Sequence, residues 1–433
     1  GSEMCIRDSY KDSGIQWLGK IPSHWEIKRS RLIFDENVET NSTCNNTNQL
    51  QFRFGTIEPK KSQEMDSDLK KIISKYTIVQ NGDIMINGLN LNYDFVSQRV
   101  AQVKEKGIIT SAYIALRPKE NICSDYFTYL LKGMDARKVF HGMGCGVRLT
   151  LSFKEFRNEL LPIPPLEEQQ SMATYLDKAT AEIDKAIAQQ QRMIDLLNER
   201  KQIIIQRAVT KGLDGNVEMK NSGLNWLGQI PSHWESLPLT YVFEMRNGYT
   251  PSKNDPTYWT NGSIPWYRME DIRKSGRFLR EAMQYVTTKA INGKGTFKAG
   301  SYIMAICTAS IGEHAMLIAD SLANQQFANF KIRKSLIESF YPLFLFYYMY
   351  VVGDFCRENS NSTCFQYVDM GALKRFPIPK PSMEEQKNIV SSLTQNLQQI
   401  NTALERIQKQ ITLLQERKQI IISEVVTGKI KVS

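Results

Sequence analysis

The sequence lacks the short motifs that mark most catalytic and metal-binding chains. No Gly-x-Gly-x-x-Gly follows a predicted strand, and no Walker loop is present. Four histidines occur among 433 residues, without metal-ligand spacing. The seven cysteines are odd in number and include no Cys-x-x-Cys pair, which argues against disulfides and structural zinc and favours a reducing compartment. We therefore expect a non-catalytic chain that binds no metal and no cofactor of its own.

Long apolar segments are also missing. Leu343 to Val352 is strongly apolar but too short to cross a bilayer, so we expect a buried helix and no membrane contact. Residues 1–9 contain no apolar core that would serve as a secretory signal. They have no counterpart later in the chain, so we interpret them as a leader or an assembly remnant. These features predict a cytoplasmic protein.

Three features imitate catalytic groups and have simpler explanations. Asn254 to Tyr258 is similar to the Asn-Pro-Pro-Tyr loop of adenine methyltransferases but lacks its second proline, so we predict a turn that begins at Asp-Pro. Glu385-Gln386-Lys387 has the Glu-x-Lys spacing of many nucleases, but it lies at the start of a predicted helix, where carboxylates favour the helix dipole. His24 and His233 each precede a tryptophan at matching positions, and we interpret them as packing residues.

An internal repeat is the strongest signal in the sequence. Residues 13–26 recur as residues 222–235 with three differences, and we call this segment the opening motif. Each copy precedes a block of about 140 residues that ends at a Pro-Ile-Pro segment, residues 162–164 and 377–379, which we call the Pro-Ile-Pro brake. A long helical pattern follows each brake. The predicted segments are therefore 1–9 (leader), 10–160, 161–212, 213–375 and 376–433, with a helix in the third and fifth.

The two helical segments carry apolar residues at heptad spacing. The first runs from Glu167 to Thr210 without proline or glycine, and the second begins near Glu384. A single helix cannot bury such a stripe, so we predict that the two pack together as an antiparallel coiled coil with pseudo-twofold symmetry. In the first helix we predict that Ala179, Ala186 and Met193 also face the partner helix, at the positions between the larger seam residues. The predicted seam consists of Leu176, Ile183, Leu197 and Ile204 in the first helix and Leu393, Ile400, Ile407 and Leu414 in the second.

The two blocks differ from each other although their frame is kept. Block one alternates apolar and polar residues in short runs at 76–79, 83–86, 99–103 and 112–116, and block two does so at 301–306 and 315–318. One helix is expected late in each block, near 126–132 and 341–351. The fold class is therefore α+β. The net charge of +10 favours nucleic acid only modestly, because most basic residues are simply solvated.

These features together resemble the specificity subunit of Type I restriction-modification systems. The resemblance extends over residues 10–430. It rests on the opening motif, on the Pro-Ile-Pro brake before each helix, and on the sequence Glu-Arg-Lys-Gln-Ile-Ile-Ile near the end of both helices. Block two adds Asn247 to Pro251, Gly262 to Trp266 and Asp271-Ile272. Block one lacks the Ile-Pro-Trp run, so its assignment depends on its position in the frame.

The resemblance implies a non-catalytic DNA reader of bacterial or archaeal origin. Each block would be a target recognition domain for one half of a bipartite site in double-stranded DNA. The helices would separate the blocks and dock two methyltransferase (M) subunits, and restriction (R) subunits would complete the complex. S-adenosylmethionine, ATP and magnesium would be bound by those partners.

Candidate DNA contacts are basic and amide side chains on loops. For any one of them a solvated turn is an equally good interpretation. The candidates are Asn87, Asn90, Asn92, Arg99, Arg148 and Lys154 in block one, and Arg246, Tyr249, Lys253, Arg268, Lys274, Arg277, Thr308, Ser310, Gln325 and Gln326 in block two.

Two other classes of function compete with DNA reading. A coiled-coil scaffold whose blocks bind proteins would tolerate the repeat, but it does not predict divergent amide-rich loops. A fused methyltransferase-specificity enzyme would need a cofactor-binding domain, and no motif for one is present.

Overall fold

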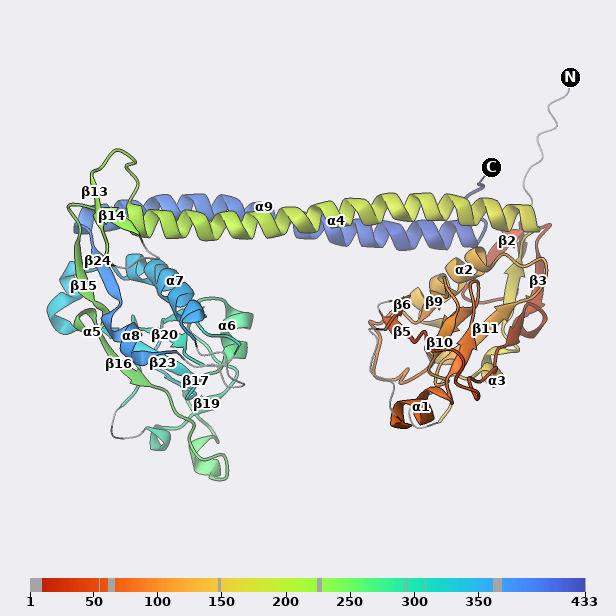
Figure 1. Ribbon diagram of the computed structural model, residues 1–433, viewed down its shortest axis with the longest axis horizontal. Coiled ribbons are helices and arrows are strands. Elements are labelled where there is room, and N and C mark those ends of the chain that lie inside the picture. The colour runs from red at the N-terminus through yellow and green to blue at the C-terminus, as the bar shows by residue number, and fades with distance from the viewer. Residues whose placement is uncertain are drawn as a thin grey trace, which may run out of the picture. The chain divides into compact units, whose positions relative to one another are not determined.

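A computed structural model describes residues 10–53, 55–60, 67–146, 149–223, 228–291, 293, 295–307, 309–360 and 368–432. Leader residues 1–9 and the candidate residues Arg148 and Thr308 lie outside this described part. The chain forms two compact units: unit 1 comprises Gly1–Gln191 and Gln408–Ser433, and unit 2 comprises Arg192–Ile407. Each unit therefore holds one recognition block together with parts of two long helices, α4 (Leu166–Lys211) and α9 (Met383–Val426) (Figure 1).

Unit 1 is built around a four-stranded antiparallel sheet of order β4-β11-β8-β9. Helix α2 (Ser124–Ala136) packs on it, and the inner side of the helix contributes buried Tyr126, Phe127, Leu130 and Leu131. The strands are β1 (Tyr10–Asp12), β2 (Lys20–Pro22), β3 (Glu26–Arg29), β4 (Phe34–Glu36), β5 (Leu50–Arg53), β6 (Thr56–Pro59), β7 (Thr77–Val79), β8 (Ile84–Ile86), β9 (Val100–Gln102), β10 (Gly107–Ile109), β11 (Ile114–Pro118) and β12 (Leu160–Ile163). The smaller helices are η1 (Ser30–Leu32), α1 (Ser67–Ile73), η2 (Val139–Gly142) and α3 (Phe153–Phe156).

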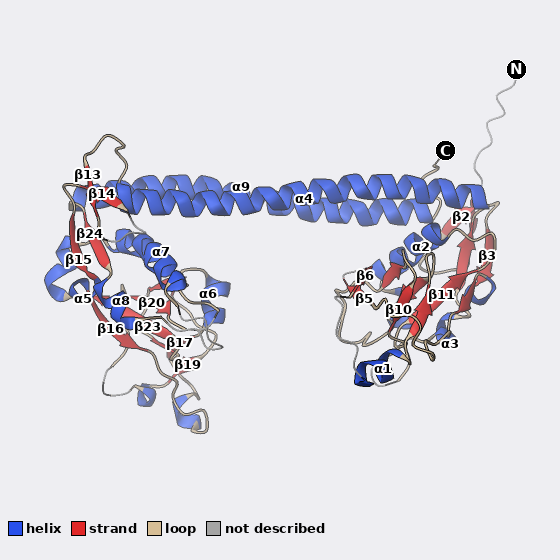
Figure 2. Cartoon of the chain, viewed as in Figure 1, coloured by secondary structure: helices blue, strands red, loops and turns tan. Residues whose placement is uncertain are grey.

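Unit 2 repeats this plan and extends it. Its five-stranded sheet has the order β16-β23-β20-β21-β18, and helix α7 (Pro342–Glu358) takes the place of α2 (Figure 2). The strands are β13 (Met219–Asn221), β14 (Gln229–Pro231), β15 (Glu235–Pro238), β16 (Phe243–Asn247), β17 (Ile264–Tyr267), β18 (Phe278–Leu279), β19 (Tyr285–Val286), β20 (Tyr302–Ala305), β21 (His314–Leu317), β22 (Leu322–Ala323), β23 (Phe327–Ile332) and β24 (Pro377–Lys380). The other helices are α5 (Leu239–Val242), η3 (Pro256–Tyr258), α6 (Met269–Ser275), η4 (Thr288–Ala290), η5 (Lys334–Ser339) and α8 (Met370–Arg375).

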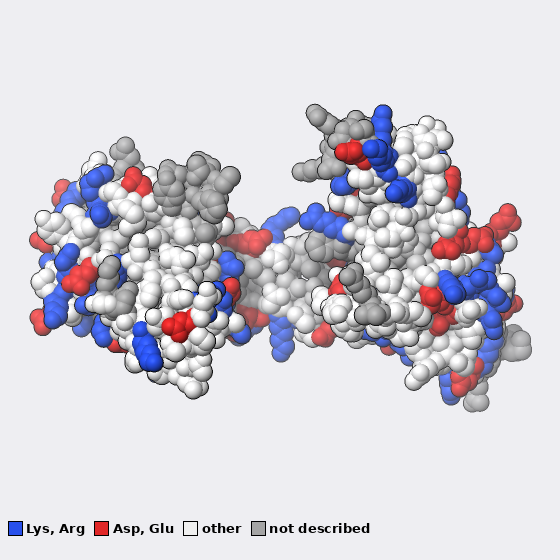
Figure 3. All heavy atoms as spheres, turned by 90° about the horizontal axis from the view of Figure 1, so that it is seen from below, with Lys and Arg blue, Asp and Glu red and all other residues white. Residues whose placement is uncertain are grey.

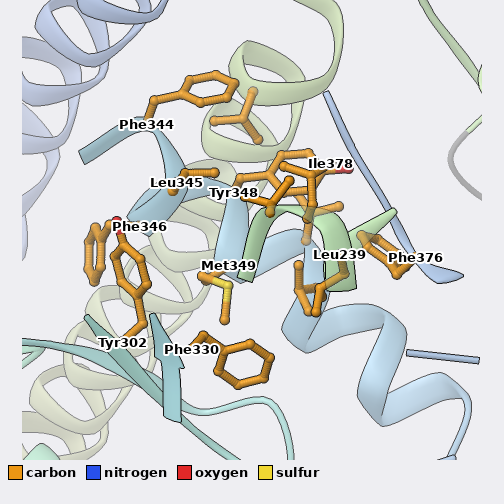
Figure 4. Close-up of a cluster of buried hydrophobic side chains, with 14 of the residues drawn as sticks. Leu239, Tyr302, Phe330, Phe344, Leu345, Phe346, Tyr348, Met349, Phe376 and Ile378 are labelled. Atoms are coloured by element: carbon orange, nitrogen blue, oxygen red, sulfur yellow. The ribbon is translucent and has the colours of Figure 1, made fainter. Parts of the chain in front are cut away.

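The apolar run that is too short for a membrane forms the centre of unit 2. Tyr348 and Met349 of α7 are buried among Tyr302 and Phe330 of the sheet and Leu239 of α5 (Figure 4). The phenol of Tyr302 donates to the carbonyl of Pro342 (2.8 Å) and that of Tyr348 to the carbonyl of Pro377 (2.9 Å), so each buried hydroxyl has a partner. The prediction of a buried helix is confirmed, and no helix in the described ranges is both long and apolar enough to cross a membrane.

The opening motif and the Pro-Ile-Pro brake form the same structure in both units. Strand β3, which follows the first motif, pairs antiparallel with β12, and β15 pairs in the same way with β24. Proline lacks an N–H group, so it suits a two-stranded ribbon in which only one edge is paired. The brake therefore leads directly from a ribbon into each long helix.

In unit 1, His24 and Trp25 of the opening motif both contact Glu168 at the start of α4, and we call this group the end clamp. The indole of Trp25 donates to Glu168 Oε2 (2.9 Å), and His24 Nε2 lies 2.7 Å from Glu168 Oε1. Trp25 is 2% exposed and packs against Gly428, whose φ of +70° follows the last turn of α9. A side chain on Gly428 would collide with the rings of Pro22 and Trp25.

Unit 2 repeats the end clamp with equivalent residues. The indole of Trp234 donates to Glu385 Oε1 (2.9 Å), His233 lies 3.2 Å from Glu385 Oε2, and Gly212 (φ +73°) adjoins the indole. His24 and His233 therefore have structural contacts with a helix carboxylate, but each side chain is 52% exposed and is not packed into a core. Glu385 lies in the first turn of α9 and is the shared partner of His233 and Trp234.

The two long helices contact each other within each unit. In unit 1, Lys418 of α9 bonds both carboxylate oxygens of Asp184 of α4 (2.6 and 2.7 Å), and in unit 2, Lys201 of α4 bonds Asn401 of α9 (3.0 Å). The predicted seam residues are all at least partly buried: Leu176, Ile183, Leu393 and Ile400 are buried, and Leu197, Ile204, Ile407 and Leu414 are half-buried.

The intermediate seam positions of α4 need one correction. Met193, predicted to face inward, is 48% exposed, whereas Thr180 is 6% exposed and Ile194 is half-buried. A seam that advances by four and then three residues from Leu176 reaches 180, 183, 187, 190 and 194, one residue later than predicted at alternate steps. The same count places Lys201 in the seam.

Candidate nucleic-acid interface

A loop of thirteen residues, 87–99, connects β8 and β9 in unit 1 and is held from inside by Arg99. This side chain is 1% exposed, and its guanidinium donates to the carbonyls of Asn87 (3.0 Å), Leu89 (2.8 Å) and Asp94 (2.7 Å). Its backbone N–H donates to Asp135 of α2 (2.7 Å). A side chain so enclosed cannot reach DNA, so the prediction of direct contact by Arg99 is corrected to a role in shaping the loop.

The outer half of this loop is fixed by Asp94. Its carboxylate accepts from the N–H groups of Val96 (3.1 Å) and Ser97 (2.9 Å), and hydrogen bonds from Ser97 lower the pKa of Asp94 to about 2. Phe95 stacks on His141 with ring centroids 4.8 Å apart. The fixed turn presents Tyr93 and Val96 to solvent, 77% and 92% exposed.

In block one, the loop 87–99 contacts the segment 149–151 and forms one surface with it. The N–H of Leu91 donates to the carbonyl of Leu149 (3.1 Å), and the N–H of Leu151 donates to that of Gly88 (2.9 Å). A Cβ on Gly88 would lie 2.3 Å from the carbonyl oxygen of Leu151, so this approach requires glycine. The candidates Asn87, Asn90 and Asn92 lie on this surface, and Lys154 is exposed on α3 beyond this segment.

In unit 2, the segment after β16 contacts the turn before β23, and both carry candidate residues. The N–H of Tyr249 donates to the carbonyl of Ala323 (2.9 Å), and the hydroxyl of Thr250 donates to Gln325 Oε1 (2.5 Å). Asn324 accepts from the N–H of Gln326 (3.1 Å). Tyr249, Gln325 and Gln326 therefore belong to one site. Lys253 is exposed further along the same loop, and Arg246 lies over the ring of Phe297 (4.5 Å), where burial lowers its pKa.

Helix α6 positions a second group of candidates. Arg268 caps its start by donating its N–H to Asp271 (2.7 Å), and its side chain pairs with Glu270 (3.5 Å). Lys274 is exposed. Arg277 donates to the carbonyl of His314 (2.8 Å). These contacts leave Lys274 with the more accessible charge.

The loop between β20 and β21, residues 306–313, contacts Arg273, which lies inside the predicted segment Arg268 to Arg277 but was not among its single candidate residues. Arg273 of α6 donates to the hydroxyl of Ser310 (3.2 Å). Nothing in the local pattern distinguishes Arg273 from its neighbours, because its role depends on a contact 37 positions away.

These loops occupy the same place in the two units. Both sheets contain the order β4-β11-β8-β9 or its equivalent β16-β23-β20-β21, so the loop 87–99 corresponds to the loop 306–313. The first has thirteen residues and the second has eight. Positively and negatively charged side chains are interspersed over the face shown in Figure 3, and neither sign covers a whole unit. The arrangement suits contacts from particular residues better than a uniform electrostatic surface.

The described residues contain no cluster of metal-binding side chains. No group of three or more His, Cys, Asp or Glu side chains in these ranges could hold a metal ion. Asp255 accepts from the N–H of Thr257 (2.9 Å) at the start of η3, which confirms the predicted Asp-Pro turn.

Comparison with known proteins agrees with the fold. Residues 54–191 and 231–413 match the family described as the Type I restriction modification DNA specificity domain. A stretch of 147 residues, 34% of this chain and 36% of the relative, is 43% identical to the EcoprrI specificity subunit of Escherichia coli. The MjaVIII specificity subunit of Methanocaldococcus jannaschii is 24% identical over 99% of both chains.

Two solved structures share the architecture. One, described as the basis of complex assembly and conformational transition in a type I R-M system, superposes with a TM-score of 0.68 at 16% identity and covers 95% of this chain and 99% of that chain. The HsdS subunit from Thermoanaerobacter tengcongensis superposes with a TM-score of 0.50 at 15% identity, with 97% and 100% covered.

Proposed function

The chain belongs to the Type I restriction-modification DNA specificity family, and from this premise we propose that each of its units reads one half of a bipartite DNA site. Specificity subunits recognise DNA sequence and do not catalyse. The observation that carries the proposal is the shared sheet order of the two units combined with their unequal loops, 87–99 and 306–313. One scaffold with two different reading surfaces fits two different half-sequences.

We propose further that α4 and α9 form one antiparallel coiled coil with pseudo-twofold symmetry. The support is that Asp184 and Asn401 are 217 residues apart and so are Lys201 and Lys418, so the polar pairs Lys418–Asp184 and Lys201–Asn401 occupy equivalent places. Only an antiparallel pair brings equivalent residues together in this reciprocal way. The helices would fix the gap between the two half-sites.

The outer faces of the helices fit two copies of one partner. Leu196 and Ile203 of α4 are 54% and 55% exposed, and their repeat equivalents Leu413 and Ile420 of α9 are 53% and 55% exposed. Each pair has heptad spacing, so each adds a second apolar stripe outside the seam. We propose that each of these outer stripes docks one methyltransferase (M) subunit. Restriction (R) subunits would then join the assembly through the M subunits.

The chemistry is assigned to those partners. We propose that S-adenosylmethionine is bound by the M subunits, and ATP and magnesium by the partners that restrict DNA. The role of this chain is then to place the modification subunits on double-stranded DNA of the correct sequence.

The test is co-expression of the chain with the M subunit of its own system, followed by long-read mapping of methylated bases in the host genome. The proposal predicts methylation at one interrupted sequence with two defined halves and a constant gap. Co-purification with M but without sequence-dependent methylation would instead support the protein-binding scaffold.

A further inference from the structure

Lys201 has an unusual environment within unit 2. It occupies a seam position of α4, and its Nζ lies 3.0 Å from Oδ1 of Asn401, a neutral group. Burial lowers the pKa of Lys201, and the nearby positive charge of Arg277 lowers it further. The ammonium is thus partly removed from water and within the electrostatic influence of a second cation.

Arg277 is held in place by contacts that do not neutralise it. Its guanidinium donates to the carbonyl of His314 (2.8 Å) and lies 5.0 Å from the ring centroid of Tyr350 on α7. Among the described residues, neither Lys201 nor Arg277 has a carboxylate within ion-pair distance. Two like charges brought together without an acid destabilise each other, and a bound anion would relieve this.

Unit 1 differs at the equivalent positions. Its helix lysine, Lys418, has both oxygens of Asp184 as partners, so the charge is neutralised within the chain. The residue of unit 1 that corresponds to Tyr350 is also different. Gln169 of α4 accepts from the N–H of Cys123 at the start of α2 (2.9 Å), and Gln386 of α9 accepts in the same way from the N–H of Tyr341 at the start of α7 (2.7 Å). Nine residues further on lie Lys132 and Tyr350, respectively.

We propose that Lys201 and Arg277 form a seat for one backbone phosphate of the bound DNA, present in unit 2 and replaced in unit 1 by the chain's own carboxylate. The proposal deepens the DNA-reading function and rests on it. Arg277 follows α6 and contacts β21, beside the loop 306–313, so the seat adjoins the reading surface. Guanidinium and ammonium groups are the usual ligands of phosphate oxygens. Helix α4 would then contact DNA as well as space the units.

The repeat supplies a matched pair of variants for the test. Asn401→Asp gives unit 2 the carboxylate that unit 1 already has, and Asp184→Asn makes the reciprocal change away from the seat. Lys201→Gln removes the charge, and Lys201→Arg keeps it. Each full-length variant is purified with the M subunit, and its binding to a DNA duplex with the mapped site is measured over a range of salt concentrations.

We expect Asn401→Asp and Lys201→Gln to weaken binding about tenfold at low salt and to lower the slope of log K against log salt by about 0.9, the contribution of one phosphate. Asp184→Asn and Lys201→Arg should keep the parental slope. A duplex with a neutral methylphosphonate at the contacted backbone position should bind the parent more weakly than the unmodified duplex does. Lys201→Gln should bind the modified and the unmodified duplex equally well.

Other outcomes separate the two hypotheses. An unchanged slope in both Asn401→Asp and Lys201→Gln would overturn the phosphate seat while leaving DNA reading intact. Loss of the M subunit from these variants, with normal salt dependence, would also overturn it and would identify a partner carboxylate as the anion. A parent complex without sequence-dependent DNA binding would contradict the function itself.

Discussion

Arg99 shows how one inward-facing side chain shapes a whole reading loop. We predict that Arg99→Met destabilises unit 1 by on the order of 3 kcal/mol, because several buried carbonyls lose a charged donor. The loop 87–99 should also become sensitive to protease. Urea denaturation and limited proteolysis measure the two effects, and Lys154→Met, at an exposed site on α3, is the control. A parental unfolding curve for Arg99→Met would show that the loop is held by other contacts.

His314 introduces a pH dependence at the residue scale. Burial, assisted by the charges of Arg277 and Arg357, lowers the pKa of His314 to about 3, against an ordinary value of 6.5. Between these values the unfolded chain binds one proton more than the folded chain, so stability falls as the pH falls. The loss approaches about 1.4 kcal/mol per pH unit well below pH 6.5.

The prediction concerns the difference between two variants. His314→Phe should reduce the loss of stability between pH 6.5 and pH 4.5, whereas His24→Gln, which alters a half-exposed side chain, should retain it. Urea unfolding at several pH values measures this. Equal pH dependence in the parent and in His314→Phe would mean that His314 takes up a proton without unfolding.

At the scale of single elements, the seam and the outer stripes of the long helices make opposite predictions. Leu413→Asp should leave the free energy of unfolding within about 0.5 kcal/mol, because the side chain is 53% exposed. It should nevertheless remove one M subunit from the complex, and Leu196→Asp with Leu413→Asp should remove both. Native mass spectrometry counts the bound subunits.

Leu393→Asp is the matched comparison, since Leu393 is 1% exposed in the seam. Burying an unpaired charge there should cost several kcal/mol. If Leu413→Asp bound two M subunits as the parent does, the outer stripe would have another role.

Periodicity explains why the helices were predictable and some details were not. Proline brakes and an uninterrupted heptad pattern locate both ends of α4 and the start of α9 to within one residue. The pattern could not distinguish Met193 from Ile194, because adjacent apolar residues fit a shifted register equally well. Short alternating runs located β8, β9, β20 and β21 for the same reason, as period-two burial is a local property.

The candidate interface was harder to predict, because its contacts join distant residues. The contact of the loop 87–99 with residues 149–151, and the contact of Arg273 with Ser310, depend on topology. Composition also could not show that Arg99 points inward, since an arginine beside a polar loop looks the same in either orientation. Lys201 was overlooked because a lysine in a heptad is usually on the outside.

At the scale of the whole molecule, modular reading makes the decisive prediction. Replacing residues 236–375 by the corresponding block of a related specificity subunit should change one half of the methylated sequence and preserve the other half and the gap. The frame that holds the block, from the opening motif to the Pro-Ile-Pro brake, is left intact. Methylation mapping provides the result, and changes in both halves or in neither would contradict modular reading.

The end clamps have a consequence for how such genes evolve. The same few contacts, Trp25 with Glu168 and Trp234 with Glu385, attach two blocks that differ in sequence. If each block reads one half-site, a gene that exchanges one contiguous segment between an opening motif and the following Pro-Ile-Pro brake would gain a new half-site in one recombination event. Its product would fold without compensating mutations elsewhere, so natural selection acts on whole reading surfaces and seldom has to rebuild them residue by residue.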